Sequence, residues 1–364
     1  MFHGARILVA PLDWGLGHAA RCVPIIRALQ EQGAVPVIGA DKGPLALLRE
    51  EFPLLEHVRI PGMEVRYAKG RSQAWAMAKQ FPAMLRQVRE EQHMFERLRR
   101  ELALDAVISD QRFGIRGAGL PSVLITHQLF PFAPFAQGVA RRINRRHIDR
   151  FDLCWVPDRA DAPGLSGALS HGEALPPQAR FIGPLNRFAY EETTHAEIHY
   201  RVVAVISGPE TQRTLLEDAV RAQLKKIEGS HLIISGKPGT GDVQQGKIRT
   251  VGHLKAEELS AAMRNAELVI SRTGYTTLMD LAAIGRGALL VPTPGQLEQE
   301  YLGRLHREMD IHRIQEQHRL DIAEVLRDPP GKNRPQQNTA ALLPAMNELA
   351  RLITQRRNAI QEHV

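Results

Sequence analysis

Residues 267–303 constrain the fold of this chain more than any other stretch, because they alternate between strand and helix patterns within a short span. An apolar run at 267–271 suits a buried parallel strand, and a turn then leads into a short helical stretch at 276–283. Glycines close that helix, and a second apolar run at 288–291 ends at a proline. This order predicts a strand–helix–strand unit, the building block of a sheet covered by helices.

The turn between the first strand and the helix has the chemistry of a phosphate site. Its residues are small or hydroxylated, and they include Arg272, Thr273, Gly274 and Thr276. Free backbone N–H groups at a helix N-terminus and the helix dipole both face an anion placed there. Asp280, about two turns into the helix, is placed to accept hydrogen bonds from ribose or sugar hydroxyls. The residues alone fit an ordinary strand–helix unit with a tight turn equally well.

The same stretch resembles the donor-nucleotide signature of GT-B glycosyltransferases of the MurG type, which move N-acetylglucosamine from UDP to a lipid-linked acceptor. The resemblance rests on SRTG at 271–274, a carboxylate in the following helix, ALLVP at 288–292 and Gln299-Glu300-Tyr301. It implies that Gln299 and Glu300 bind the donor sugar. The family has two glutamines there, so Glu300 leaves the identity of the sugar open.

A glycine-rich loop, GLGHAARC at 15–22, follows the first strand-like run of the chain. Gly15 and Gly17 let the backbone approach a ligand closely, and the His18 imidazole can take a proton from a hydroxyl or from water near neutral pH. A capping or packing histidine is the alternative that the residues leave open. MurG-type transferases carry a histidine in a similar loop, and UDP-sugar hydrolases of the pseudaminic acid pathway resemble this pattern even more closely. The resemblance makes His18 the candidate base.

The N-terminal half alternates apolar runs with helical stretches, which predicts a doubly wound, mostly parallel sheet that binds ligands at the carboxyl ends of its strands. The apolar runs lie at 6–12, 35–40, 58–60, 106–109 and 123–126. Asp110 and Arg112 follow one run and His127 follows the next, so we expect all three, with Gly15 and Gly17, on the acceptor side of a site. A structural ion pair between Asp110 and Arg112 is an open alternative.

Three segments of this half raise the question of a membrane. Residues 62–101 mix Met and aromatic side chains with basic ones, and residues 129–135 form an apolar loop with two prolines. Buried, both are ordinary packing; exposed, both suit lipid. Five arginines then stand within ten residues: Arg141, Arg142, Arg145, Arg146 and Arg150. Such a run is attracted to anionic head groups by about 1 kcal/mol per basic residue. The alternative interpretation of the run is a solvated helix face.

The C-terminal half opens with an apolar strand at 201–206, followed by Ser207 and Gly208 before a helix. A glycine turn between strand and helix again suits phosphate. By resemblance these two residues match a turn near the donor diphosphate, although Pro209 and Glu210 depart from the family pattern. His253 and Leu254 match residues that contact the uracil largely through their backbone.

These observations predict two Rossmann-like domains facing a central cleft, the GT-B form of an α/β fold. We expect an N-terminal acceptor-side domain at 1–185, a linker at 186–199, a nucleotide-sugar-binding domain at 200–338, and a C-terminal helix at 339–364 that packs back on the first domain.

Composition narrows the partners. A formal charge of +7 suits an anionic membrane or a phosphorylated substrate, while the few aromatics and the lack of a nucleic-acid motif argue against RNA or DNA. Two distant cysteines indicate a reducing compartment, so we expect a cytoplasmic protein, with attachment to the inner face of the plasma membrane as an option. Zinc-like spacing and an Asp-x-Asp pair are lacking, and we expect neither a metal nor a cofactor.

The sequence therefore predicts an inverting glycosyltransferase that moves a sugar from UDP-sugar to a hydroxyl of a lipid or lipid-linked acceptor. His18 would be its base, and helix N-termini with Arg272 would stabilise the departing UDP. A UDP-sugar hydrolase is one alternative, disfavoured by the acceptor-sized segments at 62–101 and 129–150. A non-catalytic nucleotide-sugar-binding protein is another.

Overall fold

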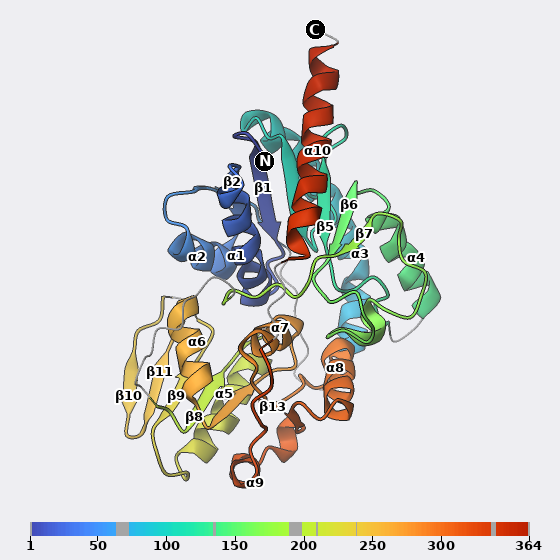
Figure 1. Cartoon of the computed structure of the whole chain (residues 1–364). Helices are drawn as coiled ribbons and strands as arrows, with labels where there is room; N and C mark the ends of the chain where they lie inside the picture. The colour runs from blue at the N-terminus through green and yellow to red at the C-terminus, as the bar shows by residue number, and fades with distance from the viewer. Residues whose placement is uncertain are drawn as a thin grey trace.

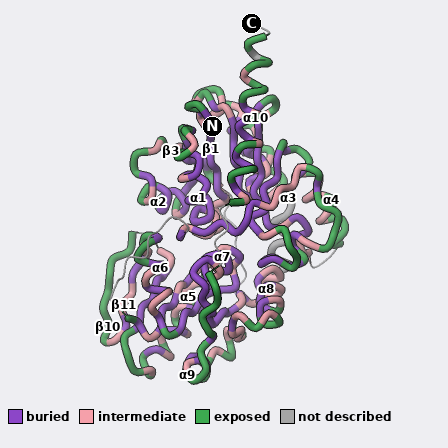
Figure 2. The backbone as a smooth tube through the Cα atoms, viewed as in Figure 1, coloured by how far each residue is buried: buried purple, intermediate pink, exposed green. Residues whose placement is uncertain are grey.

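The computed structural model describes residues 2–62, 73–133, 136–188, 199–208, 210–237, 239–335 and 340–362. It contains two α/β domains, one above the other in Figure 1, each built on a seven-stranded sheet. In both sheets the buried strands lie between helices that are exposed on their outer faces (Figure 2). The predicted pair of doubly wound sheets is confirmed.

The N-terminal sheet is parallel throughout and has the order β3-β2-β1-β4-β5-β6-β7. Its strands are β1 (Arg6–Pro11), β2 (Val35–Ala40), β3 (Glu56–Arg59), β4 (Ala106–Asp110), β5 (Ser122–Ile125), β6 (Leu153–Val156) and β7 (Ala179–Phe181). Its helices are α1 (Leu16–Glu31), α2 (Lys42–Glu51), α3 (Gln73–Glu101) and α4 (Gln137–Ile148), and a 3-10 turn covers Gly167–Leu169. Strand order reverses between β1 and β4, the place where open α/β sheets bind ligands.

The C-terminal sheet repeats this plan with the order β10-β11-β9-β8-β12-β13-β14, in which only the β10–β11 pair is antiparallel. Its strands are β8 (Val202–Val205), β9 (His231–Ile234), β10 (Val243–Gln245), β11 (Ile248–Val251), β12 (Leu268–Ser271), β13 (Leu289–Leu290) and β14 (Arg313–Ile314). Its helices are α5 (Gln212–Leu224), α6 (Ala256–Asn265), α7 (Tyr275–Ile284), α8 (Leu297–Glu308) and α9 (Ile322–Arg327), with a 3-10 turn at Gln317–Arg319. The reversal lies between β8 and β12.

The unit expected at 267–303 forms as β12, α7, β13 and α8. Strands β12 and β13 are buried on both faces, which explains their continuous apolar sequences. Helix α7 ends at Gly285 because this position has a left-handed φ of 64°. A Cβ at Gly285 would also lie 2.3 Å from the carbonyl oxygen of Asn333, so only glycine fits there.

The two domains meet where α1 approaches α7 (Figure 1). The Thr276 hydroxyl donates to the Gly17 carbonyl oxygen at 3.2 Å, and a Cβ on Gly17 would lie 3.0 Å from that hydroxyl oxygen. Tyr275 reaches across as well and donates its hydroxyl to the Pro157 carbonyl oxygen at 2.8 Å. One apolar cluster runs through both domains at this contact, so the core is continuous between them.

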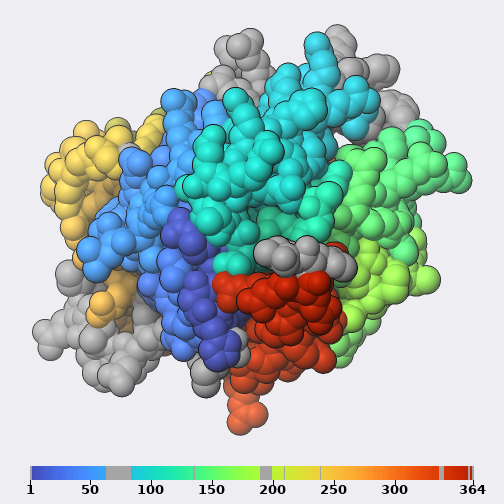
Figure 3. Space-filling model, turned by 90° about the horizontal axis from the view of Figure 1, so that it is seen from above, coloured from blue at the N-terminus to red at the C-terminus, as the bar shows by residue number. Residues whose placement is uncertain are grey.

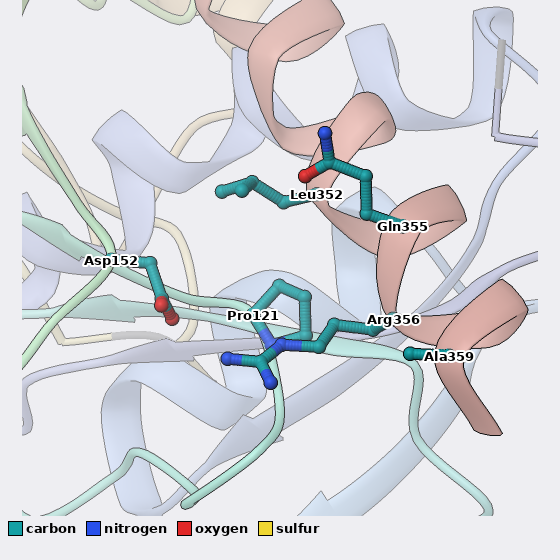
Figure 4. Close-up of a pocket in the computed structure, with 6 residues that line it drawn as sticks. All are labelled: Pro121, Asp152, Leu352, Gln355, Arg356 and Ala359. Carbon is teal, nitrogen blue, oxygen red and sulfur yellow. The ribbon is translucent and has the colours of Figure 1, made fainter. Parts of the chain in front are cut away.

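Helix α10 (Leu342–Gln361) returns to the N-terminal domain and lies along it, as Figure 3 shows in red. Leu349 and Ile353 are buried in the shared core. Arg180 binds Glu348 through two N–O contacts of 3.0 Å, and Arg357 Nε lies 2.8 Å from Asp105 Oδ1. A hollow beside this helix is drawn in Figure 4; it is lined by Pro121, Asp152, Leu352, Gln355, Arg356 and Ala359. Pro121 and Asp152 precede β5 and β6, so it lies at the end of the sheet opposite the carboxyl ends of these strands.

The segments considered for lipid contact separate into buried and exposed parts. Leu129 and Phe130 are 3% and 7% exposed, so this part of the apolar loop is packing; Pro134 and Phe135 lie outside the described residues. Phe95, in the C-terminal part of α3, is fully buried, whereas Met63 and Tyr67 lie outside the described residues. No helix in the described ranges is long and apolar enough to cross a membrane.

The arginine run lies on α4 and just beyond it, on the surface of the N-terminal domain. Arg142, Arg146 and Arg150 are exposed. Arg145 binds Asp149 at 2.7 Å, and Arg141 binds Glu173. The expectation of a basic helix face is therefore met, and its contact with lipid stays a prediction.

Candidate active site between the two domains

The parallel register of β1 and β4 brings the glycine-rich loop beside Asp110. Pro11, at the end of β1, is paired with Asp110, at the end of β4. The chain then turns through Gly15, which has a φ of 143°, and α1 begins at Leu16. His18 consequently lies in the first turn of α1, directly above the carboxyl end of β4.

His18 and Asp110 form a hydrogen-bonded dyad. His18 Nδ1 lies 3.0 Å from Asp110 Oδ2, and the Asp110 carboxylate is fully buried. Arg21, one turn further along α1, donates Nε to Asp110 Oδ2 at 2.8 Å and Nη2 to Oδ1. The contact with Asp110 uses Nδ1 of the imidazole, which leaves Nε2 as the nitrogen that can accept a proton from a substrate.

The charges around the dyad keep His18 neutral and Asp110 ionised. Burial lowers the pKa of His18, the Arg21 charge lowers it further, and Asp110 opposes both. Burial raises the pKa of Asp110, but Arg21 and His18 outweigh this, and the pKa is lowered overall. Arg21 Nη2 also lies 2.8 Å from His18 Nδ1. The carboxylate is the better partner for an Nδ1 proton, and this tautomer makes Nε2 basic.

Arg112 does not pair with Asp110, so the ion pair considered from the sequence is wrong. Its Nη2 and Nε lie 2.8 and 3.0 Å from Glu91 Oε1 on α3, and it also donates to the carbonyl oxygens of Ile60 and Pro61. The left-handed φ of 61° at Gln111 turns the chain between the two side chains. Arg112 is 1% exposed and braces the loop under α3, so an acceptor contact by its guanidinium has no support here.

His127 and Gln128 bind a carboxylate that the sequence analysis missed. Glu298, in the first turn of α8, accepts from Gln128 Nε2 at 2.7 Å, and its other oxygen lies 2.8 Å from His127 Nε2. The His127 ring stacks on Tyr275 at 4.0 Å with the planes 5° apart. These contacts cross from one domain to the other. The available signal was the acidic first turn of α8, just before Gln299 and Glu300.

The helix N-termini of α1 and α7 face each other at Gly17 and Thr276. Both leave backbone N–H groups at their first turns, and neither has a side-chain cap at its N-terminus. Thr273 directs its hydroxyl to the Gln299 carbonyl oxygen at 2.9 Å and so fixes the turn before α7. Two positive helix ends in one place form a site suited to a diphosphate.

Asp280 lies in a buried ion pair with Arg187, which belongs to the segment that connects the domains. Arg187 Nη2 is 3.2 Å from Asp280 Oδ2, and Asp280 Oδ1 is buried without a donor among the described residues. Burial raises the pKa of Asp280, and Arg187 acts against this. Burial and the same arginine lower the pKa of His253 to about 4. The expected hydroxyl contact of Asp280 stays a prediction, and it competes with Arg187.

The other predicted donor residues brace the loops around the carboxyl edge. Arg272 donates to the carbonyl oxygens of Gln212, Val291 and Pro292, and burial lowers its pKa to about 10. The Gln299 side chain accepts from the Thr293 N–H at 2.9 Å, and that of Glu300 accepts from the Gly295 N–H at 2.7 Å.

For three further residues, contact with the nucleotide-sugar donor stays a prediction. Ser207 and Gly208 follow β8, with a φ of 104° at Gly208, and Leu254 is partly buried against the core.

No cluster of three or more His, Cys, Asp or Glu side chains suited to a metal ion occurs in the part of the chain that the structure describes.

Comparison with known proteins identifies the C-terminal domain. Residues 202–347 match the family model of the glycosyltransferase family 28 C-terminal domain. A UDP-N-acetylglucosamine–N-acetylmuramyl-(pentapeptide) pyrophosphoryl-undecaprenol N-acetylglucosamine transferase from Methylobacterium sp. (strain 4-46) is 32% identical over 154 residues, 40% of this chain and 39% of the relative. The protein of the same name from Bradyrhizobium sp. (strain BTAi1 / ATCC BAA-1182) is 28% identical over 205 residues, 51% of this chain and 50% of the relative. The chain thus spans half or less of these relatives.

Solved structures extend the likeness in fold to the whole chain. The glycosyltransferase SnogD from Streptomyces nogalater has a TM-score of 0.58 with 15% identity, over 97% of this chain and 96% of that chain. The glycotransferase of kitacinnamycin has a TM-score of 0.56 with 14% identity, over 100% of this chain and 96% of that chain. The predicted GT-B fold is confirmed, as is the predicted resemblance to MurG-type transferases, and the family model matches within the C-terminal half of the chain.

Proposed function

We propose that this protein is an inverting glycosyltransferase that moves a sugar from a UDP-sugar to a hydroxyl of a lipid or lipid-linked acceptor. The observation that carries the proposal is the His18–Asp110 dyad in the first turn of α1, next to Gly17, where α1 meets the N-terminus of α7. The family of the C-terminal domain supports a nucleotide-sugar donor, and the name of the relatives supports UDP-N-acetylglucosamine as the first donor to test.

In the proposed reaction, His18 Nε2 removes the proton from the acceptor hydroxyl. The oxygen attacks the anomeric carbon from the face opposite UDP, and the bond from that carbon to the diphosphate oxygen breaks with its electron pair going to UDP. Asp110 holds Nδ1–H of His18 and stabilises the imidazolium that forms. The N–H groups of the facing helix ends stabilise the charge that develops on the diphosphate. The step requires neither a metal nor a cofactor.

The donor and the acceptor occupy opposite sides of the cleft in this proposal. The donor contacts are Ser207, Gly208, His253, Leu254, Arg272, Thr273, Gly274, Thr276, Asp280, Gln299 and Glu300. The acceptor lies against Gly15, Gly17 and His127 of the N-terminal domain, and Asp110 acts on it through His18. For Asp280, binding a hydroxyl would use Oδ1, the oxygen that has no donor among the described residues.

The basic face of α4 supports a membrane-bound acceptor. Arg142, Arg146 and Arg150 are exposed there, and Val139 on the same helix is 54% exposed. We propose that this face rests on the anionic inner leaflet, which places the protein in the cytoplasm at the membrane surface. Binding to vesicles that contain phosphatidylserine, lost in Arg142→Glu/Arg146→Glu, tests this placement; equal binding by the variant contradicts it.

Hydrolysis of the UDP-sugar is the second candidate, and Arg21 is the observation that favours it. Arg21 belongs to the loop pattern that resembles the sugar hydrolases, and it binds Asp110 beside His18. In that reaction His18 would activate water instead of an acceptor hydroxyl.

Calorimetric titration with UDP, UDP-N-acetylglucosamine and UDP-glucose, with ADP and GDP as controls, tests the donor site. Micromolar affinity confined to uridine nucleotides is expected, and the lack of a uridine preference would refute a UDP-sugar donor. Mass spectrometry of reactions with and without a polyprenyl-linked acceptor then separates the candidates. Transfer to the lipid supports the transferase, and acceptor-independent release of free sugar supports the hydrolase. His18→Ala is expected to abolish either reaction while UDP affinity stays nearly unchanged; a large loss of affinity would remove its assignment as base.

A further inference from the structure

Glu298 carries a negative charge of the C-terminal domain into the acceptor side of the cleft. Its two carboxylate oxygens are used by two neighbouring side chains of the other domain, His127 Nε2 at 2.8 Å and Gln128 Nε2 at 2.7 Å. The His127 side chain is 4% exposed and that of Glu298 is 22% exposed. The carboxylate therefore joins the two domains at a partly exposed position.

His127 and Gln128, the two residues that Glu298 binds, make further contacts that fix their positions. Tyr275 of the C-terminal domain stacks on the His127 ring, and its hydroxyl is tied to Pro157. The Gln128 N–H donates to the Thr126 hydroxyl at 2.9 Å, and Asn144 of α4 donates to the Gln128 carbonyl oxygen at 2.9 Å. His127 thus lies between two side chains of the opposite domain, and its position depends on both.

Glu298 also belongs to the set of charges around His18. Arg21 on α1 and Asp110 at the end of β4 contact the imidazole directly, and His127 after β5 and Glu298 on α8 act on it electrostatically. Asp110, in direct contact with Nδ1, is the first anion that favours the imidazolium form of His18. Glu298, held beside the site by its contact with His127, is a second.

We propose that Glu298 is a positioning residue for the reaction proposed above: it orients His127 and Gln128 across the domain boundary and stabilises the protonated form of His18. The inference rests on the proposed function for its kinetic consequence, but its electrostatic part holds for the protein without substrate. It follows that the acceptor side is complete only when the C-terminal domain is docked as it is in this structure.

The experiment compares Glu298→Gln with Glu308→Gln in the full chain. Both remove one carboxylate from α8, but Glu308 is exposed at the far end of the helix. Histidine labelled with 13C at Cε1 reports each imidazole by NMR, and His18→Gln identifies the His18 signal. We expect the pKa of His18 to fall by about half a unit to one unit in Glu298→Gln, because an anion that favours the imidazolium is removed. In Glu308→Gln it should not move.

Glu298→Asp serves as the conservative variant and as a second test should Glu298→Gln fold poorly. It keeps the charge, so the pKa of His18 should stay nearer to the wild-type value than in Glu298→Gln. With the donor and an acceptor, Glu298→Gln should move the acidic limb of the kcat profile to lower pH and reduce kcat by about tenfold. The donor KM should stay unchanged.

The outcomes for the inference and for the proposed function are separable. An unchanged His18 pKa in Glu298→Gln, or an equal fall in Glu308→Gln, overturns the inference whether or not the protein turns over a UDP-sugar. A shifted pKa in a protein without uridine-nucleotide binding or turnover sustains the electrostatic contact and overturns the proposed function.

Discussion

Removing the charge of Asp110 tests the description of the dyad most directly. Asp110→Asn keeps the shape of the side chain but leaves the Arg21 guanidinium, which is 2% exposed, without its carboxylate. Breaking a buried ion pair by removing one partner costs about 3–5 kcal/mol, because the remaining charge is buried and unpaired. That is a large share of the free energy of unfolding of an ordinary domain, roughly 5–15 kcal/mol.

Tryptophan fluorescence in a urea titration measures this loss of stability in the N-terminal domain, which contains Asp110. All three tryptophans, Trp14, Trp75 and Trp155, lie in the N-terminal half of the chain. The matched control is Arg21→Gln/Asp110→Asn, in which the unpaired cation is removed as well. The double variant should be more stable than Asp110→Asn by about 1 kcal/mol or more, since the penalty arises from the orphaned charge.

Two results would refute this description of the dyad. One is a destabilisation of Asp110→Asn below about 1 kcal/mol, which would mean that Arg21 has water or another partner. The other is additivity of the two single substitutions, which would mean that the side chains act independently. The pH dependence adds a check of sign. The pKa of Asp110 is lowered in the folded protein, so its contribution is present above the unfolded value of about 4 and is lost as the pH falls further.

Two further predictions address the domain contact and the interior of the C-terminal domain. Gly17→Val should separate α1 from α7, because even a Cβ would lie 3.0 Å from the Thr276 hydroxyl oxygen. We expect X-ray scattering to give a larger radius of gyration for this variant. Gly138→Val is the control, since a Cβ there meets nothing within 4 Å. Equal radii for the two variants would contradict the close contact. Burial lowers the pKa of His312 to about 3, so the unfolded chain binds more protons between about pH 6.5 and 3. The free energy of unfolding therefore decreases as the pH is lowered through that window. His312→Asn can still accept the Ala288 N–H and should flatten the stability curve there, as followed by circular dichroism; an unchanged slope would contradict the buried neutral state of His312.

The sequence was sufficient wherever local pattern and periodicity decide the structure. Strand β2 has the predicted bounds, and α7 begins within one residue of the expected position. Both stretches owe their form to local features: an apolar run fits a buried parallel strand, and a glycine with left-handed φ ends the helix. The position of His18 at the start of α1 follows from the same kind of reasoning.

Side-chain partners far apart in the chain were not predictable in this way. Glu298 lies 171 residues from His127, and Arg187 lies 93 residues from Asp280. The acidic first turn of α8 draws attention to Glu298, but the local pattern does not reveal its partners in the other domain. The Asp110–Arg112 pair failed for a related reason, because proximity in sequence does not give contact when a left-handed residue separates two side chains.

The return of α10 to the N-terminal domain has a consequence for biosynthesis. The 20 residues of this helix are made after both sheets, yet Leu349 and Ile353 belong to a core that begins with Ile7 of β1. A nascent N-terminal domain therefore leaves the ribosome with the apolar surface that α10 covers later. Such surfaces are the ones that aggregate or recruit chaperones. The N-terminal domain is thus expected to reach its final packing only after the C-terminal domain has been made.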